Sequence, residues 1–401
     1  NEEVTIGFKC ENTNANWITV DHFQLIKTDG GLRTGAAKPL NRGLMAVNLT
    51  TSGGTGNLIS WRIRENDPKD YSYKLYSGIS RSQKRLVNNG NPIKGRSNFI
   101  DTNGTTSTYY RLVVLDKDGN AVDSMASVKT WSNQTISIPT ITPKDTRGLN
   151  ATYTPNDASF CDMDGDGEYE IILKWDPNNS KDAASNGTTS DTYFDCYKLN
   201  GTRLWRINQG PNIRSGAHTT PFIAWDLNGD GYGEFIIKTA PGTIDGNGNY
   251  VVMNGDDPLQ DCLSGRGKPD RGPEYLTVFD GMTGAEISTI KYHTDYAAGQ
   301  SYWGDSNQNR SERYTACLAY LDGKNRNPSA IFNRGYYAGS FVGAYDFDGY
   351  TLKERWVSRN TTSGKGLWGE GAHWLTAADL DNDGFHEIQF GSAALDHNGQ
   401  L

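Results

Sequence analysis

DMDGDGEYEIILKW, which runs from Asp162 to Trp175, is the stretch that decides the fold, because it recurs later in the chain. Related copies are DLNGDGYGEFIIKT from Asp226 and DLDNDGFHEIQFGS from Asp379, and a degenerate copy, YLDGKNRNPSAIFNRGYY, starts at Tyr320. In each copy an acidic, glycine-containing loop lies next to a strand-like run. The repeat predicts a structure in which each copy forms the same supersecondary unit.

A second repeated phrase follows each copy. It reads YKLNGTRLWR at 197, TVFDGMTGAEIS at 277, AYDFDGYTLKERW at 344 and ALDHNGQL at 394. Each unit is therefore expected to contain a hairpin around the acidic loop and then a hairpin around an Asn/Asp-Gly turn. Four strands in a unit of about 60 residues are typical of a β-propeller blade. Because a propeller closes only with more blades, we expect this chain to be part of a longer one.

The acidic loops follow the pattern D-x-[DN]-x-D-G-x-x-E, which can wrap a hard cation in side-chain oxygens. An EF-hand is not favoured, because strand-like runs flank the loops and position twelve is Leu173, Ile237 or Phe390. Calcium in a structural role is the prediction. The candidate ligands are Asp162, Asp164, Asp166 and Glu170 in the first loop, Asp226, Asn228, Asp230 and Glu234 in the second, and Asp379, Asp381, Asp383 and Glu387 in the third.

Residues equidistant from a hairpin turn face each other, so the ends opposite the acidic loops should form one rim. Counting ten residues out from the third acid of a loop gives Asn156 and Asp176 in the first hairpin and His373 in the last. The strand-to-strand loops at that rim add cations, predicted to be Lys174, Lys238 and Arg334. Carboxylate, amide, imidazole and cations together indicate a site for an acidic sugar.

Upstream of the repeat the chain has a different character. Residues 1–36 hold two strand-like stretches, 4–10 and 17–26, and resemble the closing strands of a carbohydrate-binding β-sandwich module. Residues 37–145 carry strand-like stretches at about ten-residue spacing and resemble a fibronectin type III-like β-sandwich. We therefore predict an all-β chain, in which that small sandwich precedes the first blades of a calcium-binding β-propeller at 146–401.

Composition narrows the function classes. A formal net charge of −8 argues against nucleic-acid binding through a basic surface. No apolar run approaches the about 18 residues that a membrane span needs. The cysteines are odd in number and widely spaced, so they predict no disulfide framework, although one bridge stays open: they are Cys10, Cys161, Cys196, Cys262 and Cys317.

Several long phrases carry a resemblance to a known family: PNDASFCDMDGDGEYEIILKWDPNNSKD, YKLNGTRLWRINQGPNIRSGAH, GPEYLTVFDGMTGA, WGDSNQNRSERY and EGAHWLTAADLDNDG. They closely resemble rhamnogalacturonan lyases built on an eight-bladed propeller, over about residues 40–401. The resemblance implies a secreted enzyme that cleaves the rhamnose–galacturonic acid bond of the pectin rhamnogalacturonan-I backbone by calcium-dependent β-elimination. It also implies that Asn156 and Asp176 contact rhamnose and that His373 binds a catalytic-site calcium, with the remaining catalytic residues beyond Leu401.

Two other functions remain open on the residues alone. An integrin-like binding or adhesion propeller would use the same acidic loops without a catalytic rim. A glycosidase would need two opposed carboxylates, and only Asp176 stands out at the rim. Formation of an unsaturated uronate distinguishes a lyase from both.

Overall fold

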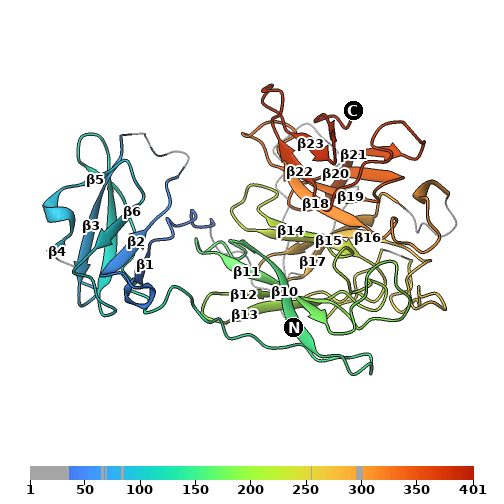
Figure 1. Ribbon diagram of the computed structural model, residues 1–401, viewed down its shortest axis with the longest axis horizontal. Helices are drawn as coiled ribbons and strands as arrows, with labels where there is room; N and C mark the ends of the chain where they lie inside the picture. Colours follow the sequence, from blue (N-terminus) through green and yellow to red (C-terminus); the bar gives the residue numbers. More distant parts are fainter. Residues whose placement is uncertain (1–35, 65–66, 68–69, 83–84, 254, 295–300) are drawn as a thin grey trace, which may run out of the picture. The chain divides into compact units, whose positions relative to one another are not determined.

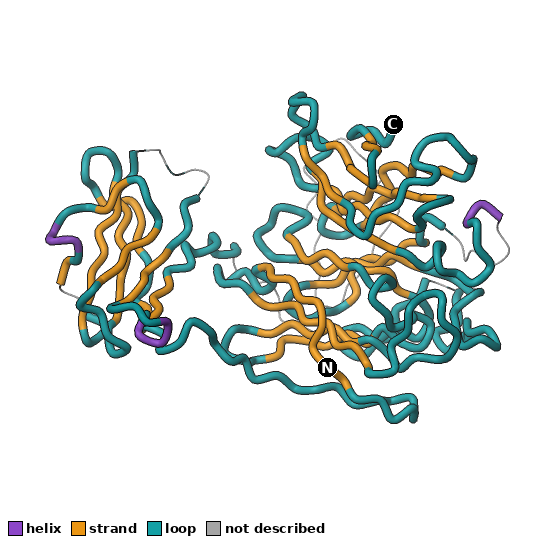
Figure 2. The backbone as a smooth tube through the Cα atoms, viewed as in Figure 1, coloured by secondary structure: helices purple, strands orange, loops and turns teal. Residues whose placement is uncertain are grey.

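The chain divides into two compact units, Asn1–Thr34 and Gly35–Leu401. The structure, a computed structural model, describes residues 36–401 apart from 65–66, 68–69, 83–84, 254 and 295–300. The strands predicted at 4–10 and 17–26 therefore lie outside the described residues. In the part that is described the regular elements are strands and short 3-10 turns, so the all-β class is confirmed (Figures 1 and 2). No helix in that part has the length and apolarity needed to cross a bilayer.

Two antiparallel sheets form the first part of the described chain. One has the order β1-β2-β6, and the other has the order β4-β3-β7-β8, with β5 paired to β3 and β9 to β7. Ile59 and Trp61, at the end of β2, share one core with Tyr73 and Leu112 of the second sheet. The bounds are β1 (Met45–Asn48), β2 (Asn57–Ser60), β3 (Ser72–Gly78), β4 (Arg85–Leu86), β5 (Ile93–Lys94), β6 (Asn98–Asp101), β7 (Tyr109–Leu115), β8 (Ala121–Ser124) and β9 (Val128–Lys129).

The repeated units form successive antiparallel sheets, each with its strands in chain order. Three of these sheets have four strands, as the repeat predicts, and the last described one has three. Their strands are β10 (Tyr153–Cys161), β11 (Glu170–Pro177), β12 (Tyr193–Tyr197) and β13 (Arg203–Asn208); β14 (Phe222–Trp225), β15 (Glu234–Thr239), β16 (Tyr275–Asp280) and β17 (Glu286–Lys291); β18 (Tyr314–Ala319), β19 (Ser329–Arg334), β20 (Ser340–Phe347) and β21 (Leu352–Asn360); and β22 (Thr376–Ala378), β23 (Glu387–Phe390) and β24 (Ala393–Leu395).

Strand β15 shows why the sheets stack. Its side chains alternate between faces, as in any strand. Phe235 and Ile237 pack into the core shared with the first sheet, and Ile236 packs into the core shared with the third. A strand buried on both faces needs a continuous apolar run rather than an alternating one, and FII in EFIIKT supplies it. The first strands β10, β14, β18 and β22 are neighbours in succession.

The hairpin of β10 and β11 departs from the predicted register. Asp176 pairs with Thr154 rather than with Asn156. The register shifts between Pro155 and Ala158, so Asn156 lies in an irregularity of β10. A bulge of this kind places an extra residue on one strand, which counting from the turn cannot foresee. Asn156 and Asp176 still lie at the same end of the hairpin, away from the acidic loop.

Candidate functional site

The acidic loops share one backbone conformation. The residue before the third acid has a positive φ in each loop: Gly165 at 67°, Gly229 at 78° and Asn382 at 66°. The glycine after that acid is also left-handed in all three loops. Glycine adopts this region without steric cost and asparagine tolerates it, which explains the letters DGDG, NGDG and DNDG.

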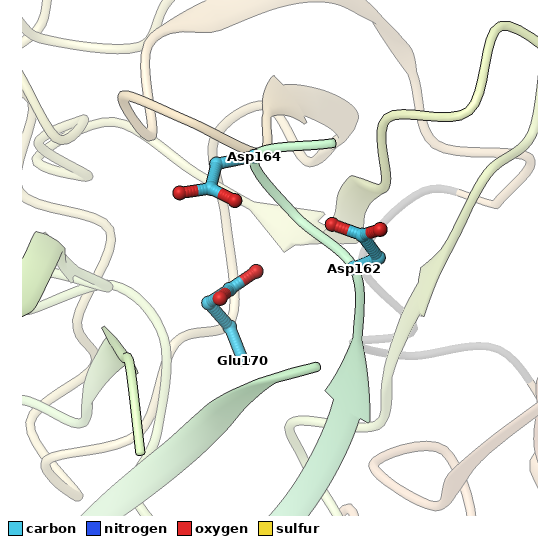
Figure 3. Close-up of side chains that lie close together, drawn as sticks. All are labelled: Asp162, Asp164 and Glu170. Atoms are coloured by element: carbon cyan, nitrogen blue, oxygen red, sulfur yellow. The ribbon is translucent and has the colours of Figure 1, made fainter. Parts of the chain in front are cut away.

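In the first loop each carboxylate accepts a hydrogen bond from a backbone N–H through one of its two oxygens. Its other oxygen is left for the interior of the loop, and Figure 3 shows the carboxylates of Asp162, Asp164 and Glu170 around one space. The backbone donors are Gly167 to Asp162 Oδ2 at 2.9 Å, Met163 to Glu170 Oε2 at 2.8 Å, Asp166 to Asp164 Oδ1 at 3.3 Å and Glu168 to Asp166 Oδ1 at 2.9 Å.

One oxygen of this interior is left unpaired. Among the residues that the structure describes, none donates a hydrogen bond to the buried Oδ1 of Asp162. Burial raises the pKa of Asp162 to about 6 and that of Glu170 to about 7. Asp162, Asp164 and Glu170 lie close enough to hold one ion. A hard cation with oxygen ligands, such as calcium, fits this donor set.

The third loop repeats the arrangement. Its four backbone bonds match those of the first, and no described residue makes a hydrogen bond to the buried Oε1 of Glu387. Asp379, Asp381 and Glu387 form the other cluster of the described chain that could hold a metal ion. The matching donors are Leu380 to Glu387 Oε2, Gly384 to Asp379 Oδ2, Asp383 to Asp381 Oδ1 and Phe385 to Asp383 Oδ1.

In the second loop, hydrogen-bond donors of the loop itself contact the carboxylate oxygens. The side-chain amide of Asn228 donates to Oδ2 of Asp230 and to Oε1 of Glu234, both at 3.3 Å. Oδ1 of Asp226 accepts the N–H of Gly229 at 2.7 Å. These contacts use oxygens that face inward in the other loops, so the second loop fits a cation less well.

A cavity of about 420 Å³ opens at the opposite end of the first strands. His218, Arg313 and His373 line it, and each comes shortly before the first strand of a sheet, namely β14, β18 and β22. From the first sheet the cavity reaches Asp157, next to the predicted Asn156. The cavity thus lies at the end of the sheets opposite the acidic loops, where the sequence predicts a rim of polar groups. Cavities of this size commonly hold small ligands.

The ring of His373 lies against two other rings at the cavity. Its centroid is 5.3 Å from that of His218 and 6.0 Å from that of Tyr336, both edge to face. Burial, with Arg313 and His373, lowers the pKa of His218, so this imidazole is neutral near neutral pH. Neither cluster of potential metal ligands in the described chain includes His373.

Arg313 is the cation of the cavity. Its Nη2 pairs with Oδ2 of Asp182 at 3.2 Å, and its guanidinium stacks over the ring of Tyr336 at 5.2 Å. Within the described part of the chain, the buried Nη1 has no hydrogen-bond partner, and neither has the buried Oγ1 of Thr220, another residue of the wall. Although burial opposes it, the N–H of Ala184 and the charge of Arg313 lower the pKa of Asp182. The wall thus carries a guanidinium that is held in place.

The predicted rhamnose contacts stand beside this cavity rather than in its lining. Asn156 is exposed, whereas Asp176 is buried and its pKa is raised by that burial. Lys174 joins the two regions: its Nζ lies 3.4 Å from Asp176 Oδ1 and 3.5 Å from Oδ2 of Asp157, which does line the cavity.

Two of the predicted rim cations are not available to a ligand. Lys238 and Arg334 are buried and both pair with Glu274, at 2.7 Å each. Arg334 also pairs with Glu312 at 2.6 Å. The prediction of free cations there is wrong, because carboxylates distant in sequence neutralise them. Arg313 and His218 were not predicted from the sequence. The available signal was that each comes shortly before the first strand of a sheet.

Two family models match this chain. The model for rhamnogalacturonan lyase family 11, C-terminal domain, matches residues 135–401, and that for the rhamnogalacturonan I lyases beta-sheet domain matches residues 36–131. Rhamnogalacturonan exolyase YesX of Bacillus subtilis (strain 168) is 42% identical over 364 residues, which are 90% of this chain and 56% of YesX. Rhamnogalacturonan endolyase YesW of the same strain is 43% identical over 381 residues, 94% of this chain and 58% of YesW.

Solved structures agree with these relatives. The crystal structure of the exotype rhamnogalacturonan lyase YesX superposes with a TM-score of 0.82 at 41% identity, covering 91% of this chain and 58% of that one. The Bacillus licheniformis rhamnogalacturonan lyase PL11 gives a TM-score of 0.80 at 40% identity, covering 91% and 61%. The chain thus spans less than two thirds of the length of these relatives.

Proposed function

Since the chain belongs to rhamnogalacturonan lyase family 11, we propose that its full-length protein cleaves the rhamnose–galacturonic acid bond of rhamnogalacturonan-I by calcium-dependent β-elimination. The observation that carries this proposal is the cavity where Arg313, His218 and His373 converge. The four successive sheets are, in this proposal, blades of a propeller, and residues 37–145 are a fibronectin type III-like sandwich. The protein is secreted, where pectin and calcium are both available.

The reaction explains the residue types. β-Elimination removes the proton on C5 of the uronate, and negative charge then builds up beside its carboxylate. Groups already held in place stabilise such charge best. Arg313 is held by Asp182 and Tyr336, so its positive charge has a fixed place at the cavity wall. Asn156 and Asp176 are proposed to bind the adjoining rhamnose through hydroxyl hydrogen bonds.

Calcium is proposed in the first and third acidic loops, and one ion beside His373 would offset charge on the uronate. In the loops its role is structural, because they lie at the end of the sheets away from the cavity. What this chain supplies at the cavity is a guanidinium and two imidazoles.

The direct test is the product of the full-length protein acting on rhamnogalacturonan. We expect ultraviolet absorbance to rise, because elimination leaves an unsaturated uronate. New reducing ends without that absorbance would show a hydrolase. Binding with neither product would show a carbohydrate-binding propeller.

Replacing Arg313 by Met should raise KM for rhamnogalacturonan by roughly 10- to 100-fold, because hydrogen bonds to charged groups contribute about 1.5–3 kcal/mol. Arg313→Lys should recover part of the loss, since it keeps the charge but not the fork of donors. The matched control is Arg355→Met, because Arg355 pairs with Asp322 at 2.7 Å, outside the cavity. An unchanged KM in a folded Arg313→Met enzyme would contradict this role.

A further inference from the structure

A lysine side chain enters the interior of the first acidic loop. Lys198 follows β12, and its Nζ lies 2.5 Å from Oδ2 of Asp164, 2.8 Å from Oδ2 of Asp166 and 3.8 Å from Oε1 of Glu170. These are the inward oxygens that the backbone leaves free. Lysine side chains are protonated at neutral pH, and the adjacent carboxylates of Asp164 and Asp166 favour the charged form, so the side chain is an ammonium ion.

The corresponding turns of the other sheets carry the opposite charge. In the first sheet the N–H of Lys198 donates to the carbonyl of Thr202, which closes the turn between β12 and β13. The residue that makes the same turn bond is Asp280 in the second sheet, Asp348 in the third and Asp396 in the fourth. Lys198 is therefore a departure from the repeat.

The third loop has no such cation in the part of the chain that the structure describes. Among the described residues, no lysine or arginine forms an ion pair with Asp379, Asp381, Asp383 or Glu387. Its inward oxygens are otherwise those of the first loop, and the buried Oε1 of Glu387 has no hydrogen-bond partner among the residues described. The second loop uses the amide of Asn228 instead. The three loops thus share one sequence pattern but differ in the group that faces their inward oxygens.

We propose that the ammonium of Lys198 takes the place of a divalent cation in the first loop, so that this loop closes without calcium and binds calcium more weakly than the third loop. The inference rests on the calcium sites of the proposed function. An ion that enters the first loop must displace Nζ from Asp164 and Asp166, whereas the third loop offers its oxygens directly. Ligand charge and rigidity change calcium affinity by decades in comparable loops.

The test is a calcium titration of the full 401-residue chain, followed by calorimetry, with melting temperatures in calcium and in chelator. We expect Asp381→Asn to remove the tightest binding and most of the effect of the chelator, and Asp164→Asn to change neither. Lys198→Met should add a second tight site, tighter than the first-loop site of the wild type by about tenfold or more. It should also make the melting temperature more sensitive to chelator.

Lys353→Met is the matched control, because Lys353 pairs with Asp348 at 2.7 Å in the turn of the third sheet and reaches no acidic loop. An unchanged titration in Lys198→Met would overturn the inference, as would loss of the tightest site in Asp164→Asn. If Lys198→Met folds only in calcium, that result supports the inference. If Lys198→Met folds neither in calcium nor in chelator, the calcium titrations of Lys198→Gln and Asp164→Asn test the inference instead. A normal response to Asp381→Asn with no effect of Lys198→Met would leave the calcium proposal standing and refute only the role of Lys198.

Discussion

Replacing His373 by Ala in the full-length enzyme should lower the rate of elimination on rhamnogalacturonan by about 100-fold or more, because one preorganised group at a developing charge is worth about 2.7–4 kcal/mol. His373 is exposed at the cavity wall, with its ring edge to face with those of His218 and Tyr336. Its loss should therefore change stability little, within about 0.5 kcal/mol. Absorbance of the unsaturated product measures the rate.

Two further variants separate a functional from a supporting role of this ring. His373→Gln keeps a polar side chain of similar reach, so a merely supporting role predicts near wild-type turnover. The matched control is His397→Ala, because the ring of His397 packs on Phe385 at 4.8 Å, outside the cavity. Near wild-type elimination by His373→Ala would be decisive against the assignment.

Replacing Arg334 by Met should destabilise the chain by about 3–5 kcal/mol, because it leaves carboxylates buried without their partner. Arg334 is 0% exposed and pairs with Glu274 and Glu312, and it also stacks near the rings of Trp303 and Tyr314. The midpoint of urea unfolding measures the loss.

The loss of stability in Arg334→Met should depend on pH. Burial acts to raise the pKa of Glu274, but Arg334 and Lys238 hold it below its ordinary value. Pairing of this carboxylate therefore adds stability above its unfolded-state pKa, and that stability is lost as the pH falls through the folded-state pKa. The difference between wild type and Arg334→Met should shrink in acid. Arg355→Met serves as the surface control, and an equally stable Arg334→Met protein would contradict the buried network.

The parts of the structure that could be predicted are those decided locally. The acidic loops have the expected form because glycine or asparagine allows two left-handed residues, and the Asp and Glu side chains then reach the N–H groups of their own loop. The unit of paired hairpins follows from turn spacing. The rim of polar groups away from the acidic loops is likewise a local prediction, because residues equidistant from a hairpin turn face each other.

Other parts depended on contacts between segments far apart in the chain. Asn156 lies in an irregularity of β10, so its register with Asp176 could not be counted from the turn. Lys238 and Arg334 carry charges that suit a sugar acid, but Glu274 neutralises both. Arg313 lies in the long connection between β17, which ends at Lys291, and β18, which begins at Tyr314, and no repeat aligns it with the other units.

The sequence by itself determined the all-β class, the repeated units and the oxygen sets of the acidic loops, because each depends on a few neighbouring residues with fixed backbone preferences. Only the tertiary structure decided which charged groups are free to act. The ammonium of Lys198 reaches the first loop, the amide of Asn228 closes the second, and the third has no cation in the described part of the chain. The physical reason is that a charged side chain can act on a ligand only when no partner neutralises it. In successive sheets those partners come from strands that lie far apart in the sequence.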